Sequence, residues 1–170
     1  MPSQQIAFIF PPFAHDYPGN LFPDLHGFQT VFSGYLKKAS LFTGTDLENF
    51  NTISCDFLDD ELKTQYIAYI LGCTLSDYFD RKGIVAGYSA GYSMGIYTAL
   101  HHAGAIYFET GLDLIRSAYA LIRETIEGDE FLMGSIIGLT REDILQLKHS
   151  SEQKSEITIR NSDCSFILSG

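Results

Sequence analysis

Apolar residues near the N-terminus form a short run without polar interruption. Residues 6–10 are all apolar, and Pro11 and Pro12 end the run. A run of this length is typical of a strand that is buried on both faces, as in a parallel sheet. Residues 84–90 form a second run of apolar and small residues, and they predict a second strand.

Helical periodicity appears between and after these two strands. Two amphipathic stretches lie near residues 27–40 and 58–80, where apolar residues recur at helical spacing. Further helices are expected near residues 94–103 and 109–126. Strands that alternate with helices in this way predict an α/β layer structure.

The pattern changes in the last quarter of the chain. Residues 134–138 predict a strand, and a helix is expected to begin after Thr140, with Asp143 three positions on. Residues 156–160 and 166–168 predict two further strands, separated by a turn composition. This order indicates the beginning of a second, smaller β-α-β-β unit.

The composition indicates a folded chain and argues against two kinds of partner. Hydrophobic residues make up 45% of the 170 residues, and the formal net charge is −10, with acidic residues spread along the chain. A surface of this sign repels phosphate backbones, so we expect no nucleic-acid partner. Residues 83–108 lack charged side chains but contain serines, tyrosines and glycines, so we expect a buried strand and helix there and no membrane segment.

The cysteines predict no metal or redox chemistry. Cys55, Cys73 and Cys164 are odd in number and match no zinc or redox spacing. We expect buried thiols in a reducing cytoplasm and no metal site. The N-terminus also lacks the basic region and apolar run of a secretory signal, which agrees with a cytoplasmic protein.

The pattern G-x-S-x-G occurs twice, at residues 87–91 and 91–95. At a sharp strand-to-helix turn, this pattern holds a serine hydroxyl clear of the sheet, and the small neighbours prevent clashes. The N–H of the following residue and the helix N-terminus then stabilise negative charge on an attacked carbonyl group. The alternative interpretation is an ordinary glycine-rich turn between a strand and a helix.

Ser93 fits such a turn slightly better than Ser89. If Ser89 is the turn residue, Gly91 and Gly95 fall inside the helix, where glycine is unfavourable. If Ser93 is the turn residue, Gly91 lies at the turn and Ser89 is a small residue of a longer strand.

A serine nucleophile needs a base, and no histidine in the sequence is a good candidate. His101 and His102 follow Ser93 on the same predicted helix, roughly 12–14 Å away along its axis, which is too far for proton transfer. They are expected at the helix end, where they help satisfy C-terminal carbonyl groups. The remaining histidines have no evident role as a base: His15, His26 and His149.

Residues 91–100, GYSMGIYTAL, resemble the segment G-H-S-L-G-E-Y-A-A-L around the active serine of malonyl-CoA:acyl-carrier-protein transacylases and polyketide-synthase acyltransferase domains. This register places the serine of the family on Ser93. Further segments resemble the family in the same order, so the resemblance spans nearly the whole chain: residues 6–19, 64–65, 103–108, 133–139, 161–162 and 166–170.

The resemblance implies an α/β fold in two parts. Residues 1–127 are expected to form the N-terminal part of a large subdomain with an α/β-hydrolase-like parallel sheet layer. Residues 128–170 are expected to begin a small ferredoxin-like subdomain, which is incomplete. The catalytic histidine of the family comes later in the sequence, so the resemblance implies that this chain lacks it. A missing C-terminal half or a second copy of the chain is therefore an expected partner.

The resemblance also implies the reaction and the site. Ser93 would accept an acyl group from acyl-CoA and pass it to the phosphopantetheine thiol of an acyl carrier protein, with no other cofactor. The backbone N–H groups of Phe13 and Met94 would form the oxyanion hole. The remaining elbow and pocket positions would be Gly91, Tyr92, Gly95, Ile96, Gln65, Ala118 and Asn161.

The sequence departs from the family at several of these positions. Tyr92 replaces a histidine, Ile96 a glutamate and Phe13 a glutamine, although the backbone donor at residue 13 is kept. The arginine that pairs with the malonyl carboxylate aligns with Ala118, and Arg116 lies on another side of the predicted helix. We therefore expect either malonyl or an uncharged acyl group as the substrate.

Two other functions stay open. A small serine esterase or thioesterase would need a histidine placed by an unrecognised fold. A catalytically degenerate relative would bind a carrier protein or a partner chain. The missing histidine and arginine favour the degenerate relative over full activity, whereas the intact G-x-S-x-G pattern argues against it.

Overall fold

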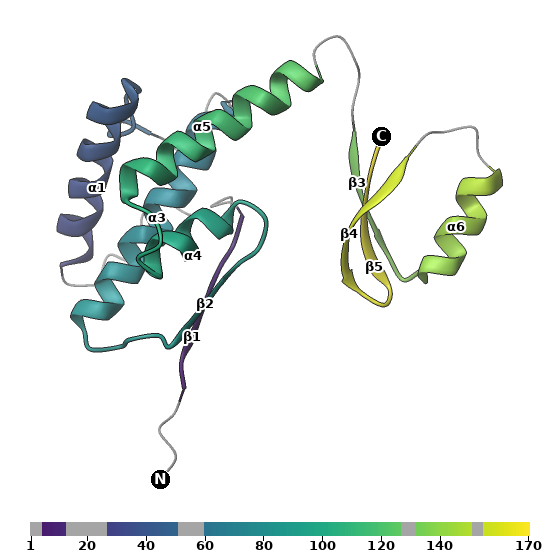
Figure 1. Ribbon diagram of the computed structural model, residues 1–170, viewed down its shortest axis with the longest axis horizontal. Coiled ribbons are helices and arrows are strands. Elements are labelled where there is room, and N and C mark those ends of the chain that lie inside the picture. Colours follow the sequence, from purple (N-terminus) through teal and green to yellow (C-terminus); the bar gives the residue numbers. More distant parts are fainter. Residues whose placement is uncertain (1–4, 13–26, 51–59, 127–131, 151–154) are drawn as a thin grey trace. The chain divides into compact units, whose positions relative to one another are not determined.

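The computed structural model (Figure 1) describes five stretches of the chain: residues 5–12, 27–50, 60–126, 132–150 and 155–170. Contacts divide the chain into two compact units, Met1–Leu121 and Ile122–Gly170.

The first unit contains a parallel strand pair with helices. Its described elements are β1 (Ala7–Phe10), α1 (Phe28–Thr43), α3 (Glu61–Arg81), β2 (Tyr88–Gly91), α4 (Gly95–His102) and most of α5 (Phe108–Thr125). β1 and β2 run parallel, with Phe8 opposite Ser89. A parallel pair whose strands are separated by helices confirms the predicted α/β class (Figure 1).

All four helices predicted for this part of the chain are present, and local signals set their ends. α3 begins after Asp60, whose carboxylate accepts a hydrogen bond from the Lys63 N–H at 3.0 Å. α1 ends at Gly44, which has a left-handed φ of 72° and donates its N–H to the Ser40 carbonyl. The apolar periodicity predicted these helices, and the caps fix the residues at which they begin and end.

An apolar core lies between α1, α3 and the first half of α5. Phe28, Ile67 and Leu112 are fully buried in it. The rings of Tyr69 and Phe108 stack, with centroids 5.3 Å apart. Burial of these large side chains stabilises the helical layer through the hydrophobic effect.

The prediction that the first strand is buried on both faces is wrong. Phe8 and Phe10 lie on the face that α3 and α4 cover, where both rings pack near His102. Ile9 lies on the opposite face and is 76% exposed. Because side chains alternate along a strand, a single covering layer buries only every second residue. No described element covers the second face.

The predicted strand at residues 84–90 is also too long. β2 begins only at Tyr88, and Val85 is 66% exposed. After α3, Gly83 adopts a φ of 79° and the Ile84 N–H donates to the Phe79 carbonyl. Because Ile84 belongs to the turn that ends α3, the first residues of the apolar run do not pair with β1.

The second unit is a small antiparallel sheet with one helix. Its described elements are β3 (Met133–Ile137), α6 (Arg141–Ser150), β4 (Glu156–Ser162) and β5 (Ser165–Ser169). The strand order is β3-β5-β4. This arrangement confirms the predicted β-α-β-β order.

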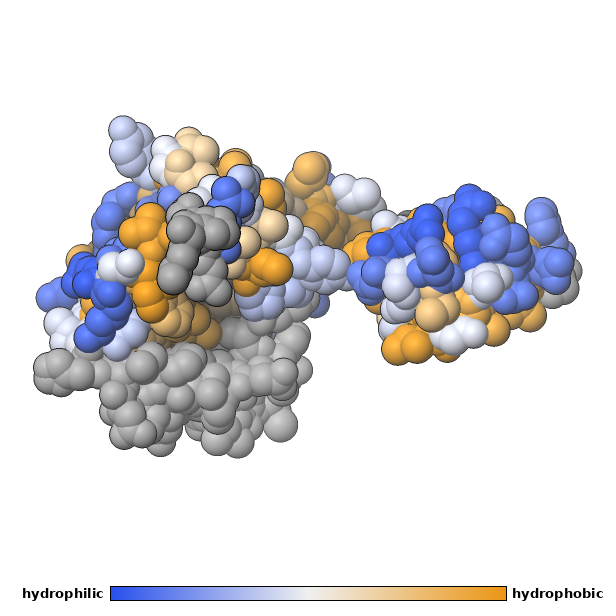
Figure 2. Space-filling view, turned by 90° about the horizontal axis from the view of Figure 1, so that it is seen from below, coloured by the Kyte–Doolittle hydropathy of each residue, from blue (hydrophilic) through white to orange (hydrophobic). Residues whose placement is uncertain are grey.

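The helix of this unit is capped as the sequence predicts. The Asp143 N–H donates to the Thr140 hydroxyl, and the Asp143 carboxylate accepts from the Thr140 N–H at 2.9 Å. The Thr140 hydroxyl also donates to the Asp143 carboxylate at 2.7 Å, and this hydrogen bond, together with the one from the Thr140 N–H, lowers the pKa of Asp143. Ile144 and Phe166 are fully buried. Other apolar side chains stay on the surface, and Figure 2 shows them in orange among the blue polar residues of both units.

Within the described stretches, no helix combines the length and apolar character that crossing a membrane requires. The same stretches contain no cluster of three side chains able to hold a metal ion.

The prediction of buried thiols is correct for one cysteine and wrong for another. Cys73 is fully buried in α3, and burial raises the pKa of its thiol well above the ordinary value. Cys164 is exposed, because it lies in the tight turn between β4 and β5. Cys55 lies outside the described residues.

We expect these two thiols to differ strongly in reactivity, because only an accessible thiolate is nucleophilic. In a Cys55→Ser variant of the folded protein, maleimide should modify Cys164 quickly and leave Cys73 unmodified until denaturant is added. Intact mass measured over time gives both rates. Equal labelling of the two cysteines under native conditions would contradict the burial of Cys73.

Candidate active site

The turn between β2 and α4 holds Ser93 in an unusual backbone conformation. Its φ is 50°, and it is the one non-glycine residue with a positive φ among those that the structure describes. An L-residue in this left-handed region costs about 1–2 kcal/mol. The Tyr92 N–H donates to the Phe10 carbonyl at 3.0 Å and so ties the turn to the end of β1. Ser93 is exposed at the surface of the unit.

Two glycines make this turn possible. A Cβ atom on Gly95 would lie 2.1 Å from the Phe10 carbonyl oxygen, and one on Gly91 would lie 2.2 Å from the Ile96 backbone nitrogen. Both contacts are with backbone atoms, which cannot move aside as a flexible side chain does. The second G-x-S-x-G pattern thus has the geometry of a nucleophile elbow.

The first G-x-S-x-G pattern has a different geometry. Ser89 lies within β2, and its hydroxyl donates to the Ala99 carbonyl of α4 at 3.3 Å. A Cβ atom on Gly87 would meet no atom within 4 Å. Of the two serines, only Ser93 therefore lies at the strand-to-helix turn.

The start of α4 adds a hydrogen-bond donor beside Ser93. The N–H groups of Gly95, Ile96 and Tyr97 each donate to the carbonyl three residues earlier. Among the described residues, the N–H of Met94 has no such acceptor. The first N–H groups of a helix carry partial positive charge, so this position suits a developing oxyanion. Phe13, the other expected donor, lies outside the described residues.

The structure gathers some of the predicted site residues and not others. Tyr92 and Ile96 flank Ser93 and are both about two-fifths exposed, at 42% and 44%. Gln65 and Ala118 are half-buried on α3 and α5. Asn161 is exposed on β4 in the second unit. Only the six positions 91–96 form one continuous site.

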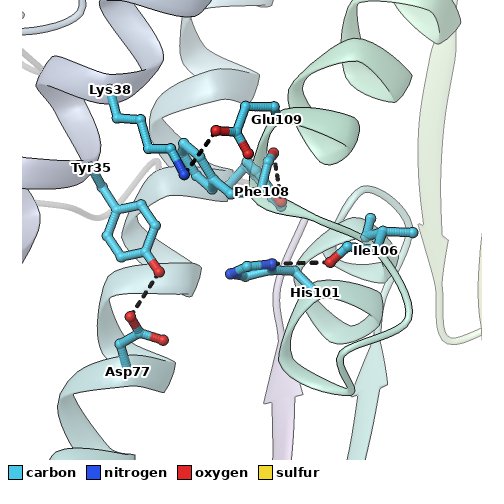
Figure 3. A network of polar contacts seen from close by, with 8 residues as sticks. Tyr35, Lys38, Asp77, His101, Ile106, Phe108 and Glu109 are labelled. Carbon is cyan, nitrogen blue, oxygen red and sulfur yellow. Dashed lines mark hydrogen bonds and ion pairs between the residues drawn. The ribbon is translucent and has the colours of Figure 1, made fainter.

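The described histidines of the first unit are held by other groups. Figure 3 shows the His101 ring turned toward the Ile106 carbonyl, 3.3 Å from Nδ1. The His102 Nδ1 lies 2.6 Å from the Ser76 hydroxyl. The prediction that both satisfy carbonyl groups near the helix end therefore fits His101 and is wrong for His102. Neither ring bonds to Ser93, and His15 and His26 lie outside the described residues.

A polar network among α1, α3 and α5 has a structural role (Figure 3). The Tyr35 hydroxyl donates to the Asp77 carboxylate at 2.7 Å, and Lys38 pairs with Glu109 at 2.8 Å. The ion pair lowers the pKa of Glu109, whereas burial raises the pKa of Tyr35. These contacts join α1 to α3 and α5.

Comparison with known proteins extends the description of the site. No family model matches the sequence. The malonyl CoA-acyl carrier protein transacylase of Synechocystis is 30% identical over 98 residues, which cover 58% of this chain and 31% of that protein. The transacylase of Bacillus subtilis is 28% identical over 95 residues, which cover 54% of this chain and 30% of that protein.

A solved structure shows that the similarity extends to the fold. It contains a type II polyketide-synthase acyl carrier protein in complex with its malonyl-transacylase, and it matches with a TM-score of 0.84 at 24% identity. The match covers 98% of this chain and 55% of that chain, so this chain spans about half the length of the matched protein. The expected resemblance is thus confirmed: this chain is similar, in sequence and in fold, to the N-terminal portion of the malonyl CoA-acyl carrier protein transacylases.

Proposed function

We propose that this chain carries the acyl-accepting serine of an acyltransferase that moves an acyl group from coenzyme A to an acyl carrier protein. The observation that carries the proposal is the left-handed Ser93 between two glycines that tolerate no side chain. The acyl donor, a coenzyme A thioester, and the acceptor, an acyl carrier protein, are taken from the names of the two similar proteins. The solved complex of a related transacylase with its carrier protein supports the same acceptor.

In the first step, the Ser93 Oγ attacks the thioester carbonyl of acyl-CoA. A C–O bond forms and the C–S bond breaks. The hydroxyl proton passes to a base and then to the sulfur of the departing coenzyme A. The N–H groups of Met94 and Phe13 stabilise the oxyanion, and the N-terminus of α4 adds to this stabilisation.

In the second step, the phosphopantetheine thiol of the carrier protein attacks the acyl-Ser93 ester. A C–S bond forms, the C–O bond breaks, and the thiol proton returns to the Ser93 Oγ. Acyl-CoA and the phosphopantetheine-bearing carrier protein are both substrates, and the proposal includes no resident cofactor.

We also propose that the protein is cytoplasmic. Residues 1–127 belong to the large subdomain and residues 128–170 to the small one.

His101 and His102 bond to Ile106 and Ser76, so we assign the base for both steps to neither of them. This observation favours a second candidate function, in which the chain binds a carrier protein without turnover. The two functions differ in one property: only the acyltransferase forms an acyl-Ser93 ester.

The experiment that tests the proposal measures intact mass after incubation with malonyl-, acetyl- or longer acyl-CoA. Imidazole is added as an external base, because it can accept the Ser93 proton when no side chain of the protein does so. We expect the mass of one acyl group to be added, with a higher rate when imidazole is present. No added mass with any of the three donors would favour the binding function.

In the resemblance to the family, residue 118 takes the place of the arginine that pairs with the malonyl carboxylate, so we expect its nature to decide which acyl group is preferred. An arginine at this position would offer a bidentate hydrogen bond to a malonyl carboxylate. Such a charged hydrogen bond contributes about 1.5–3 kcal/mol, so Ala118→Arg should raise the ratio of malonyl to acetyl transfer by about tenfold or more. Ala118→Gln, which adds bulk without charge, is the matched control. An equal change in both variants would show that residue 118 does not contact the carboxylate.

A further inference from the structure

The large side chains around Ser93 fall into two groups. Met94 and Tyr97 are half-buried and pack against the apolar core of the first unit. Tyr92 and Ile96 stay on the surface, where they are 42% and 44% exposed. The other positions of the turn are glycines. Tyr92 and Ile96 are therefore the large side chains of the turn that lie in the open beside Ser93.

The backbone holds both of these residues close to Ser93. The Ile96 N–H donates to the Ser93 carbonyl at 3.1 Å, in the first turn of α4. Tyr92 directly precedes Ser93, and its own N–H donates to the Phe10 carbonyl at 3.0 Å. An acyl group bonded to the Ser93 Oγ would therefore lie next to an aromatic ring and a branched alkyl group.

The segments that form the strand pair, the turn and α4 carry no carboxylate, ammonium or guanidinium group. Residues 5–12 and 83–108 include no Asp, Glu, Lys or Arg. The N–H groups of residues 95–97 already donate to carbonyls of the turn, and the proposed oxyanion takes the Met94 N–H. A carboxylate on the acyl group would thus lose water without gaining a partner in these two segments, which is unfavourable.

An alkyl chain, in contrast, gains by contact at the same place. Each methylene group that becomes buried raises a binding constant about fourfold. We propose that Tyr92 and Ile96 form an apolar contact surface that selects an uncharged alkyl chain, such as butyryl, over an acyl group that ends in a carboxylate. The inference rests on the proposed function, because it names the class of acyl group that Ser93 accepts.

The test measures binding without turnover, in the full chain with the substitution Ser93→Ala. The probes are butyryl-pantetheine and malonyl-pantetheine, which are similar in size and differ in the terminal methyl or carboxylate group. An NMR titration gives both dissociation constants, and the methyl signals of Ile96 report the contact. We expect butyryl-pantetheine to bind at least about tenfold more tightly and to shift these signals. Ser93→Gly repeats the measurement in a turn without backbone strain.

Further substitutions in the Ser93→Ala chain separate charge from apolar contact. Ile96→Lys offers an ammonium group to a carboxylate, so it should tighten the binding of malonyl-pantetheine about tenfold. Ile96→Gln has a similar length without the charge, and it should weaken only butyryl-pantetheine. Tyr92→Ala should weaken butyryl-pantetheine by about fourfold or more. Leu41→Ala shortens a 78% exposed side chain of α1 and should change neither constant.

The inference is overturned if malonyl-pantetheine binds as tightly as butyryl-pantetheine, or if neither binds. It is also overturned if Ile96→Lys and Ile96→Gln change malonyl binding equally. The acyl adduct on the unchanged chain tests the proposed function separately. A preference for butyryl-pantetheine without any adduct would contradict the proposed function alone, whereas an adduct without this preference would contradict the inference alone.

Discussion

Gly95→Ala is expected to destabilise the protein by about 3 kcal/mol, the upper end of the usual cost of overpacking. The added methyl group would lie 2.1 Å from the Phe10 carbonyl oxygen. Relief would require β1 and the start of α4 to move apart, which would also break the hydrogen bond from the Tyr92 N–H to Phe10. The melting temperature should fall by about 10 °C.

Gly87→Ala is the matched control for this prediction. The same methyl group at residue 87 would meet no atom within 4 Å. Its effect on the melting temperature should therefore be small. Equal losses in Gly87→Ala and Gly95→Ala would show that the close approach of α4 to β1 does not determine stability.

Ser93→Ala is expected to abolish the acyl adduct, because it removes the attacking oxygen and leaves the turn in place. Ser89→Ala should keep the adduct, since the Ser89 hydroxyl only donates to the Ala99 carbonyl. A loss of the adduct in Ser89→Ala alone would assign the chemistry to the other serine.

Ser93→Gly separates the backbone strain from the chemistry. Glycine removes the left-handed cost of about 1–2 kcal/mol, and its greater freedom in the unfolded chain costs about 0.4–1 kcal/mol. This variant should also form no adduct, yet unfold at a higher temperature than Ser93→Ala. Equal melting temperatures of the two variants would contradict the φ of 50° at Ser93.

Much of the fold follows from local signals in the sequence. Helix α3 has both a periodic apolar face and the Asp60 cap, and α6 has the reciprocal Thr140–Asp143 contacts, so both were predictable. The length of β2 was not predictable. Ile84 and Val85 have strand-forming side chains, but they directly follow the turn at Gly83 that ends α3, and β2 begins only at Tyr88.

The two faces of β1 could not be distinguished from the sequence. An uninterrupted apolar run predicts burial on both sides, and it cannot show which other elements are present to cover them. Ile9 is exposed because the described helices lie on the Phe8 and Phe10 side. The close approach of α4 to α3 was also missed, although Gly72 on α3 signals it: a Cβ atom there would lie 2.7 Å from the Thr98 side chain of α4.

The part of the site around Ser93 was predictable from the sequence, whereas the site residues on other elements were less so. The pattern around Ser93 combines a strand, a turn and a helix within a few residues, so local sequence specifies it. Gln65, Ala118 and Asn161 come from distant elements, and their roles depend on tertiary placement that the local sequence does not define. His102 bonds to Ser76 because α4 packs on α3, which is likewise a tertiary contact.

The most direct test of the central claim is tandem mass spectrometry of the acylated protein. Trypsin releases residues 83–116 as a single peptide that contains both serines. We predict that the acyl mass lies on Ser93, so that only fragments containing this residue are heavier. An acyl group on Ser89, or on any residue outside the turn between β2 and α4, would contradict the account.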